Sequence, residues 1–169
     1  MSPSSLIAAP QVLVFDTGPL WELVLYSAVH TLRFASLKGH LRHLMTDTYY
    51  RRLTEFVASF QKRTTTPHVV AEISSWIIRT DPNQQSPIWG VVYNEFRQMG
   101  MNETILKLLE MPQELVAEVG AVDVSVLKLG ASLGPRKSLV LSIDERLIAE
   151  CKRAGLAAKN LWEVIAEET

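Results

Sequence analysis

Two aspartates follow stretches that have the composition of buried strands. Asp16 comes directly after the run Val12–Phe15, and Asp144 ends the similar stretch Ser138–Ile143. Continuous β-branched, aliphatic and aromatic runs are typical of strands that are covered on both faces in a parallel sheet. In open α/β sheets, ligands bind outside the carboxyl ends of the strands. Both carboxylates are therefore predicted to lie where a sheet of this kind does its chemistry.

Two further acids fall early in predicted helices. Glu72 belongs to a helix that Thr66 can cap and Pro67 can start. Asp123 lies just after Gly120, in the first turn of another helix. The start of a helix that follows a strand lies at the carboxyl edge of the sheet, so these acids are expected near the same edge.

Each acid also has an ordinary structural explanation. Asp16 could simply cap the helix that follows it, and Asp123 could only complement the dipole of its own helix. Glu72 could be an exposed glutamate that pairs with His68 or Arg79 on the same helix face. Taken one acid at a time, these explanations stay open.

The alternation of strands and helices predicts how the acids are arranged. Strands that alternate with helices are typical of a parallel sheet covered on both faces, and right-handed crossovers place successive strand ends on one edge. The predicted fold class is α/β: a three-layer α/β/α sandwich with a central, mostly parallel sheet of roughly four or five strands. Asp16, Glu72, Asp123 and Asp144 are then expected to converge at the carboxyl edge.

Carboxylates gathered in this way would need a cation, because clustered negative charges repel one another. Hard oxygen ligands with open coordination positions suit Mg²⁺ or Mn²⁺. Zinc would favour histidine or cysteine, and neither follows the predicted strands. One or two such ions can activate water and clamp a scissile phosphate. The pattern therefore predicts a Mg²⁺- or Mn²⁺-dependent site for cleaving a phosphodiester.

Four motifs, in order along the chain, resemble those of a known family. They are Val14–Leu20 around Asp16, Thr66–Glu72, Val122–Ser125 around Asp123, and Leu139–Asp144. In this order and spacing they resemble the PIN-domain ribonucleases, the family that includes the VapC-like toxins of toxin–antitoxin pairs. The resemblance spans nearly the whole chain from Val12 onward. It implies metal-dependent hydrolysis of RNA by a PIN-like α/β/α sandwich.

The resemblance also implies roles for individual residues. The catalytic, metal-binding acidic tetrad would consist of Asp16, Glu72, Asp123 and Asp144, supported by the small hydroxyl side chains of Thr17 and Ser142. Two members, Asp16 and Asp144, would hold the main ion. The other two would complete the pocket and orient the attacking water.

The chain departs from the family pattern in three places. Gly18 stands where many members carry Asn or Ser, although a glycine variant is known. Val122 stands where Thr or Asp is common, and the segment Ile78–Gln113 is longer than in a typical toxin. These departures bear on the toxin role more than on nuclease activity.

Composition limits the partners and the compartment. The 169 residues are enough for one domain, predicted at 11–169 after a flexible tail at 1–10. With a formal net charge of −1, RNA would have to bind through local basic groups or metal ions. The single cysteine, Cys151, excludes an internal disulfide and fits a reducing, cytoplasmic compartment. No apolar stretch is long enough to cross a membrane, and the start does not resemble a signal peptide.

Basic side chains outside the apolar helix stripes are weak candidates for RNA contact at the rim of the site. They are Arg42, Arg51, Arg52, Arg136 and Lys137. Solvated surface charge is the ordinary explanation for such residues.

The remaining elements follow from periodicity and from turn residues. Helices are predicted at Leu20–Phe34, Thr46–Lys62, Ile88–Met99, Pro112–Val119 and Trp162–Glu167, with Gly18 and Pro19 starting the first. A strand is predicted at Leu156–Leu161, a loop at Thr80–Pro87, and Glu103–Met111 is undecided between strand and helix.

The leading hypothesis is a metal-dependent endoribonuclease, with a toxin role that would add an antitoxin protein as partner, and with a homodimer as the expected assembly. One alternative is a catalytically silent PIN-like module that acts through protein or RNA binding. Another is a different acid-pocket α/β protein. A receiver domain would need paired acids after the first strand, and a haloacid-dehalogenase-type enzyme would need an aspartate in place of Gly18.

Overall fold

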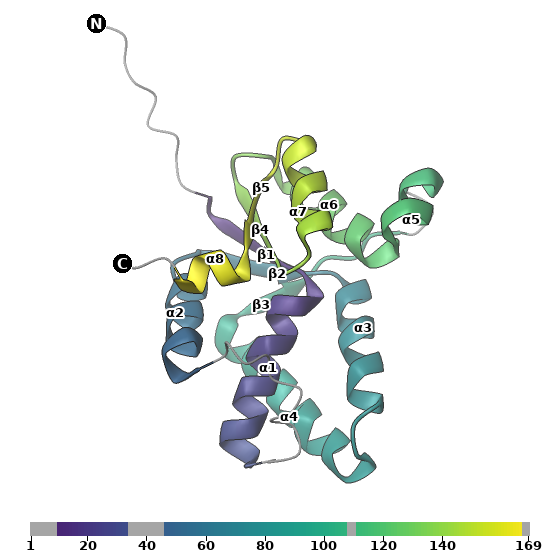
Figure 1. Cartoon of the computed structure of the whole chain (residues 1–169). Helices are drawn as coiled ribbons and strands as arrows, with labels where there is room; N and C mark the ends of the chain where they lie inside the picture. The colour runs from purple at the N-terminus through teal and green to yellow at the C-terminus, as the bar shows by residue number, and fades with distance from the viewer. Residues whose placement is uncertain (1–9, 34–45, 108–110, 167–169) are drawn as a thin grey trace, which may run out of the picture.

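A parallel sheet of five strands forms the centre of the molecule, in the order β3-β2-β1-β4-β5. The computed structural model describes residues 10–33, 46–107 and 111–166. Helices flank the sheet on both faces, so the chain is an α/β/α sandwich, and the predicted fold class is confirmed (Figure 1). The strands are β1 (Val12–Phe15), β2 (Lys62–Thr65), β3 (Met101–Glu103), β4 (Ser138–Ser142) and β5 (Ala157–Asn160).

The first strand of the chain is the central strand of the sheet. Val14 of β1 pairs with Thr64 of β2 on one side and with Val140 of β4 on the other. Leu13, Val14 and Phe15 are fully buried, as the continuous apolar run predicts. All four pairings are parallel, so the ends of β1, β2 and β4 meet at one carboxyl edge.

Eight helices cover this sheet within the described ranges. They are α1 (Thr17–Leu32), α2 (Asp47–Ala58), α3 (Pro67–Ile78), α4 (Pro82–Met99), α5 (Gln113–Val119), α6 (Ala121–Leu133), α7 (Glu145–Arg153) and α8 (Leu161–Ala166). Helix α6 contacts β1 and β4, and α7 contacts β4 and β5, whereas α1 packs against α3 and α4. In Figure 1, α1 and α3 extend from the sheet next to one another. No helix in the described part of the chain is long and apolar enough to cross a membrane.

The cap and start residues predicted for α3 are confirmed. Thr66 takes the cap position, where its Oγ1 accepts a hydrogen bond from the Val69 N–H at 3.3 Å, and Pro67 is the first helical residue. The predicted start of α1 is wrong by two residues. The helix begins at Thr17, and Asp16 rather than Gly18 occupies the cap position.

The predicted loop Thr80–Pro87 is also wrong, because most of it belongs to α4. Asp81 caps this helix by accepting the Asn83 N–H at 2.9 Å, and Pro82 follows in the first turn. A proline there loses nothing, since the first N–H groups of a helix have no partner within it. Pro87 lies inside the helix and removes one hydrogen bond from it. Gly100 ends the helix in the left-handed conformation, with φ of 57°.

Other boundaries differ by smaller amounts. Of the undecided segment Glu103–Met111, the described residues 103–107 and 111 contribute the end of β3, which begins earlier at Met101. Helix α2 ends at Ala58, four residues before the predicted end at Lys62, because β2 starts at Lys62. The predicted tail at 1–10 falls outside the described residues except for Pro10.

Candidate active site

The four predicted acids lie at the carboxyl edge of the sheet. Asp16 directly follows β1, and Asp144 lies two residues after the end of β4. Glu72 is in the second turn of α3, and Asp123 is the third residue of α6. Their charges act on one another. Burial raises the pKa of Asp123 to about 7, and the carboxylates of Asp16, Asp144 and Glu72 add to that rise.

Asp16 is the most deeply buried of these acids, with 6% of its surface exposed. Its carboxylate Oδ2 accepts a hydrogen bond of 2.6 Å from the Ser142 hydroxyl. Burial raises the pKa of Asp16, and the Ser142 hydrogen bond opposes that rise. Although Asp16 stands at the cap position of α1, its side chain makes no capping hydrogen bond. The explanation of Asp16 as a plain helix cap is therefore not supported.

Glu72 is held by a hydroxyl from a different helix. The Thr17 Oγ1 donates a hydrogen bond of 2.6 Å to Glu72 Oε2, which links the start of α1 to α3. Thr17 is itself buried, so this hydroxyl has little choice of partner. Among the described residues, neither His68 nor Arg79 forms an ion pair with Glu72. The alternative of a surface glutamate paired along its own helix is therefore wrong for the described residues.

Asp144 also caps a helix, which the sequence analysis did not predict. Its Oδ1 accepts the backbone N–H groups of Arg146 at 2.7 Å and Leu147 at 3.3 Å, so it caps α7. Its own N–H donates to the Ser142 Oγ at 2.9 Å. One hydroxyl thus donates to the carboxylate of Asp16 and accepts from the backbone of Asp144. Both hydroxyls predicted to support the acids, at positions 17 and 142, contact them in the structure.

A second hydroxyl pair fixes α6 against α3. The Oγ atoms of Thr66 and Ser125 lie 2.8 Å apart, and Ser125 Oγ also donates to the Val122 carbonyl at 2.6 Å. Ser125 is fully buried and lies two residues after Asp123, so this contact sets the position of Asp123 relative to the helix that carries Glu72. Ser125 belongs to the motif around Asp123, but the sequence predicted no role for it.

Gly18 allows a close approach that brings two of the acid-bearing segments together. A Cβ placed on Gly18 would lie 2.3 Å from Cγ1 of Ile143, the residue between β4 and Asp144. Carbon atoms that are not bonded cannot approach so closely. A side chain at position 18 would therefore force either the Ile143 side chain or the start of α1 to shift. Packing against Ile143 therefore gives a structural reason for glycine at position 18.

The donor set suits a hard cation, although it is not closed around one. Among residues 10–33, 46–107 and 111–166, no group of three acidic, histidine or cysteine side chains is close enough to hold a metal ion as it stands. Three of the acids are anchored through one oxygen each, and a carboxylate has about four lone-pair sites in all. A divalent ion bound between carboxylates that raise one another's pKa offsets their electrostatic repulsion. Oxygen ligands of this kind fit Mg²⁺ or Mn²⁺.

Cys151 lies near this group but is not equipped to take part in it. The residue is buried on α7, and burial raises the pKa of its thiol to about 12, with further rises from Asp16 and Asp123. Metal ions and electrophiles react with the thiolate. A thiol held in its protonated form is therefore a core residue here.

Arg146 acts electrostatically on Asp123, and the sequence analysis missed it. Its positive charge lowers the pKa of Asp123, against the effect of the carboxylates. Its guanidinium donates to the Glu118 carbonyl, which ties the first turn of α7 to α5. An arginine two residues after a strand-end aspartate was the available signal.

Two of the basic residues proposed for RNA contact do not lie at this edge. Arg136 and Lys137 precede β4, and the Lys137 carbonyl accepts the Val12 N–H at the start of β1. They therefore lie at the amino edge of the sheet, opposite the acids. Arg52 donates to the Ile165 carbonyl at 2.8 Å and joins α2 to α8. Arg51 is exposed on α2, and Arg42 lies outside the described residues.

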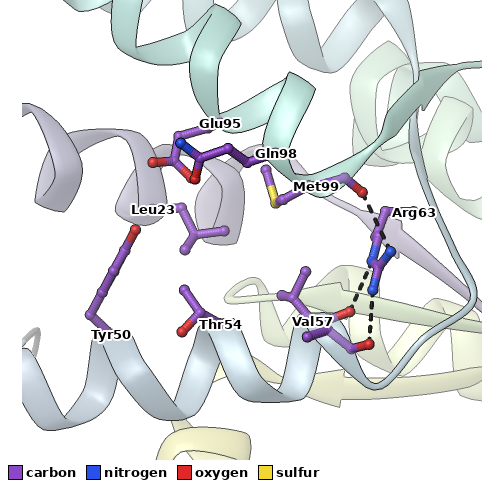
Figure 2. A pocket seen from close by; sticks show the side chains of 9 residues that line it. Leu23, Tyr50, Thr54, Val57, Arg63, Glu95, Gln98 and Met99 are labelled. Atoms are coloured by element: carbon purple, nitrogen blue, oxygen red, sulfur yellow. Dashed lines mark hydrogen bonds between the residues drawn. The ribbon is translucent and has the colours of Figure 1, made fainter.

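A hollow of about 200 Å³ lies away from the acids, among α1, α2 and α4 (Figure 2). The buried carboxylate of Glu95 faces it and accepts a hydrogen bond of 2.6 Å from Ser27. On its other side, Arg63 donates to the Val57 and Ala58 carbonyls at the end of α2 and to the Met99 carbonyl at the end of α4. The hollow includes none of the four acids, so the two places are separate.

No family model matches the chain, and no curated protein matches it in sequence.

Proposed function

We propose that the chain is a Mg²⁺- or Mn²⁺-dependent endoribonuclease, which hydrolyses phosphodiester bonds of RNA at Asp16, Glu72, Asp123 and Asp144. One observation carries the proposal: four acids from four separate elements lie at the carboxyl edge of the sheet, and burial and the charges of the other three raise the pKa of Asp123. A fold gains no stability from carboxylates that repel one another at the edge where ligands bind. A bound divalent cation would remove that repulsion.

Asp16 and Asp144 would hold the main ion, while Glu72 and Asp123 would complete the pocket. When bound, the ion lowers the pKa of water and offsets the negative charge that develops on the phosphate. Two features of the chain support this division. Asp16 and Asp144 share the Ser142 hydroxyl, which holds them in one arrangement. Glu72 keeps one oxygen for Thr17 and so has the other for a ligand or a water.

The protein's own residues would then place the substrate. Glu72 and Asp123 would accept hydrogen bonds from the attacking water and direct it in line with the leaving oxygen. Arg146, whose charge already acts on Asp123, would attract a phosphate towards the acids. The toxin role, the antitoxin partner, the homodimer and the cytoplasmic location stay predictions from the sequence.

The test is cleavage of a fluorescently labelled, unstructured RNA in Mg²⁺, in Mn²⁺ and in EDTA. The parent should cleave only with metal. Asp16→Asn should be inactive with a native fold, because asparagine keeps an oxygen acceptor for Ser142 and lacks the charge. Glu55→Gln, an exposed position on α2, is the matched control and should retain activity.

Two outcomes would contradict the proposal. Equal cleavage in EDTA would exclude the metal-dependent mechanism. If the parent binds RNA but cleaves none in either metal, the silent binding module becomes the better description.

A further inference from the structure

A cleft lined by two tryptophans opens between α1 and α3. Its lining residues are Trp21, Trp76, Arg79 and Thr80, and its volume is about 190 Å³. Cavities of about 150 Å³ are known to hold a ring the size of benzene. This cleft is therefore large enough for one flat aromatic group.

The cleft lies next to the acids along both helices. Trp21 is five residues after Asp16, and Trp76 is four residues after Glu72. At about 1.5 Å of rise per residue, these tryptophans are about 6–8 Å farther along their helices than the acids. The hydrogen bond between Thr17 and Glu72 joins the two helices on the side of the acids. The tryptophans and the acids therefore lie on the same two helices, separated by about one to one and a half helical turns.

The two indole rings form a firm platform. Their centroids are 5.5 Å apart and their planes meet at 75°, so the edge of one ring packs against the other. A planar guest cannot enter between rings in this arrangement. It can stack on the indole surface that faces the cleft, because both tryptophans are only half-buried.

Arg79 contributes a positive charge to the lining of the same cleft. Arg79 is exposed, and its guanidinium has no acidic partner among the described residues. The nearest acid in sequence, Asp81, uses its carboxylate to cap α4. The Thr80 hydroxyl donates to the Ile77 carbonyl and keeps its lone pairs for another donor. Aromatic faces with a neighbouring guanidinium are what proteins use to bind a base and its phosphate.

We propose that this cleft binds an unpaired nucleobase of the RNA strand, next to the phosphodiester that is hydrolysed at the acids. Arg79 would contact a phosphate of the RNA backbone. Cleavage of the neighbouring bond rests on the proposed function. Binding of the base requires neither metal nor cleavage. A base in a duplex is already stacked on both faces. The substrate class is therefore single-stranded RNA, with little preference for one base, because every base has a face that can stack.

Binding is measured in EDTA, by fluorescence anisotropy of 5′-labelled hexa-adenylate RNA. Trp76→Ala should raise the dissociation constant about 5- to 150-fold, the range for loss of one stacked base. Trp76→Phe should recover most of that loss, because an aromatic face is restored. Trp89→Phe is the matched control, since Trp89 lies on α4 against Tyr93 and outside the cleft, and it should leave binding unchanged.

Arg79→Gln tests the charge separately and leaves the core untouched, because Arg79 is exposed. Loss of one phosphate contact should reduce the slope of log affinity against log salt by about 0.7 for a single strand. This variant keeps the test decisive if Trp76→Ala does not fold. An RNA duplex of the same length should bind much more weakly than hexa-adenylate.

The inference is overturned if Trp76→Ala folds and binds like the parent. If Trp76→Ala does not fold, the inference is overturned when Arg79→Gln keeps both the affinity and the salt slope of the parent. Equal binding of the duplex would overturn it as well. If the parent cleaves RNA and Trp76→Ala has the same KM as the parent, the proposal of base binding in the cleft is wrong and the proposed nuclease activity is retained. If Trp76→Ala and Arg79→Gln bind RNA more weakly but the parent cleaves no RNA, the proposed nuclease activity is wrong and the proposal of base binding in the cleft is retained.

Discussion

Replacing Asp123 with asparagine should make the metal-free protein more stable at neutral and alkaline pH. The substitution keeps the shape of the side chain and removes one charge from the group of acids. Burial, Asp16, Asp144 and Glu72 raise the pKa of Asp123 from 3.8 to about 7 in the folded protein. An aspartate in the unfolded chain keeps the lower value.

The sign of the effect follows from which state holds the proton. Between the two pKa values the folded state keeps the proton of Asp123 and the unfolded state loses it. The free energy of unfolding therefore falls as pH rises through this window, and the loss is complete above the folded pKa of about 7. A rise of about 3 units corresponds to about 4 kcal/mol at most. Because the side chain is partly exposed, solvent screening reduces the expected loss to about 1–2 kcal/mol.

The assay is urea unfolding in EDTA at about pH 4.5 and at about pH 8, on either side of most of the window. Asp123→Asn should match the parent at the lower pH and exceed it by about 1–2 kcal/mol at the higher pH. Glu55→Gln should show the pH dependence of the parent. Excess Mn²⁺ should stabilise the parent and reduce its difference from Asp123→Asn, because metal binds only the folded state.

Equal losses of stability in the parent and in Asp123→Asn between the two pH values would refute this reasoning. Asp123 would then be a solvated residue of the first turn of α6, where a carboxylate only complements the helix dipole.

Two further predictions concern the supports of the acids. Gly18→Ala should lower the free energy of unfolding by about 1–3 kcal/mol, because its Cβ would meet Ile143, and Gly18→Ala with Ile143→Ala should recover most of the loss. Urea unfolding of the parent, both single variants and the double variant measures this, and an unchanged Gly18→Ala would contradict it. Thr17→Val removes the hydrogen bond to Glu72 and should weaken metal affinity or activity about 10- to 100-fold in a folded protein. A titration of RNA cleavage with Mn²⁺ measures this, and a curve identical to the parent's would contradict it.

The positions of the acids could be predicted because they depend on topology. An aspartate that ends an apolar strand lies at the carboxyl edge wherever that strand sits in a parallel sheet. The same rule could have placed Arg136 and Lys137, which precede β4 and therefore belong to the amino edge. Positive charge makes a residue a candidate for RNA contact, but it does not indicate which edge of the sheet the residue occupies.

Other features depend on contacts between residues far apart in the chain. The approach of Ile143 to Gly18 and the bond between Thr66 and Ser125 could not be read from either segment by itself. The start of α4 was missed for a local reason. Prolines are read as helix breakers, yet Pro82 stands in the first turn, where the missing N–H has no cost, and only Pro87 lies within the helix.

The central place of β1 has a consequence for the order in which the protein is made. Asp16 and Ser142, which are hydrogen-bonded in the finished fold, are 126 residues apart in the chain. On a ribosome that adds about 5–20 residues per second, the stretch from Glu72 to Asp144 takes roughly 4–14 seconds to appear. During that time β1 can pair with β2 and β3 can join them, but β4 is absent. An unfinished chain that ends before Asp123 therefore carries only Asp16 and Glu72, and the acid group stays incomplete until Asp144 is added, while ribosomal RNA is close by.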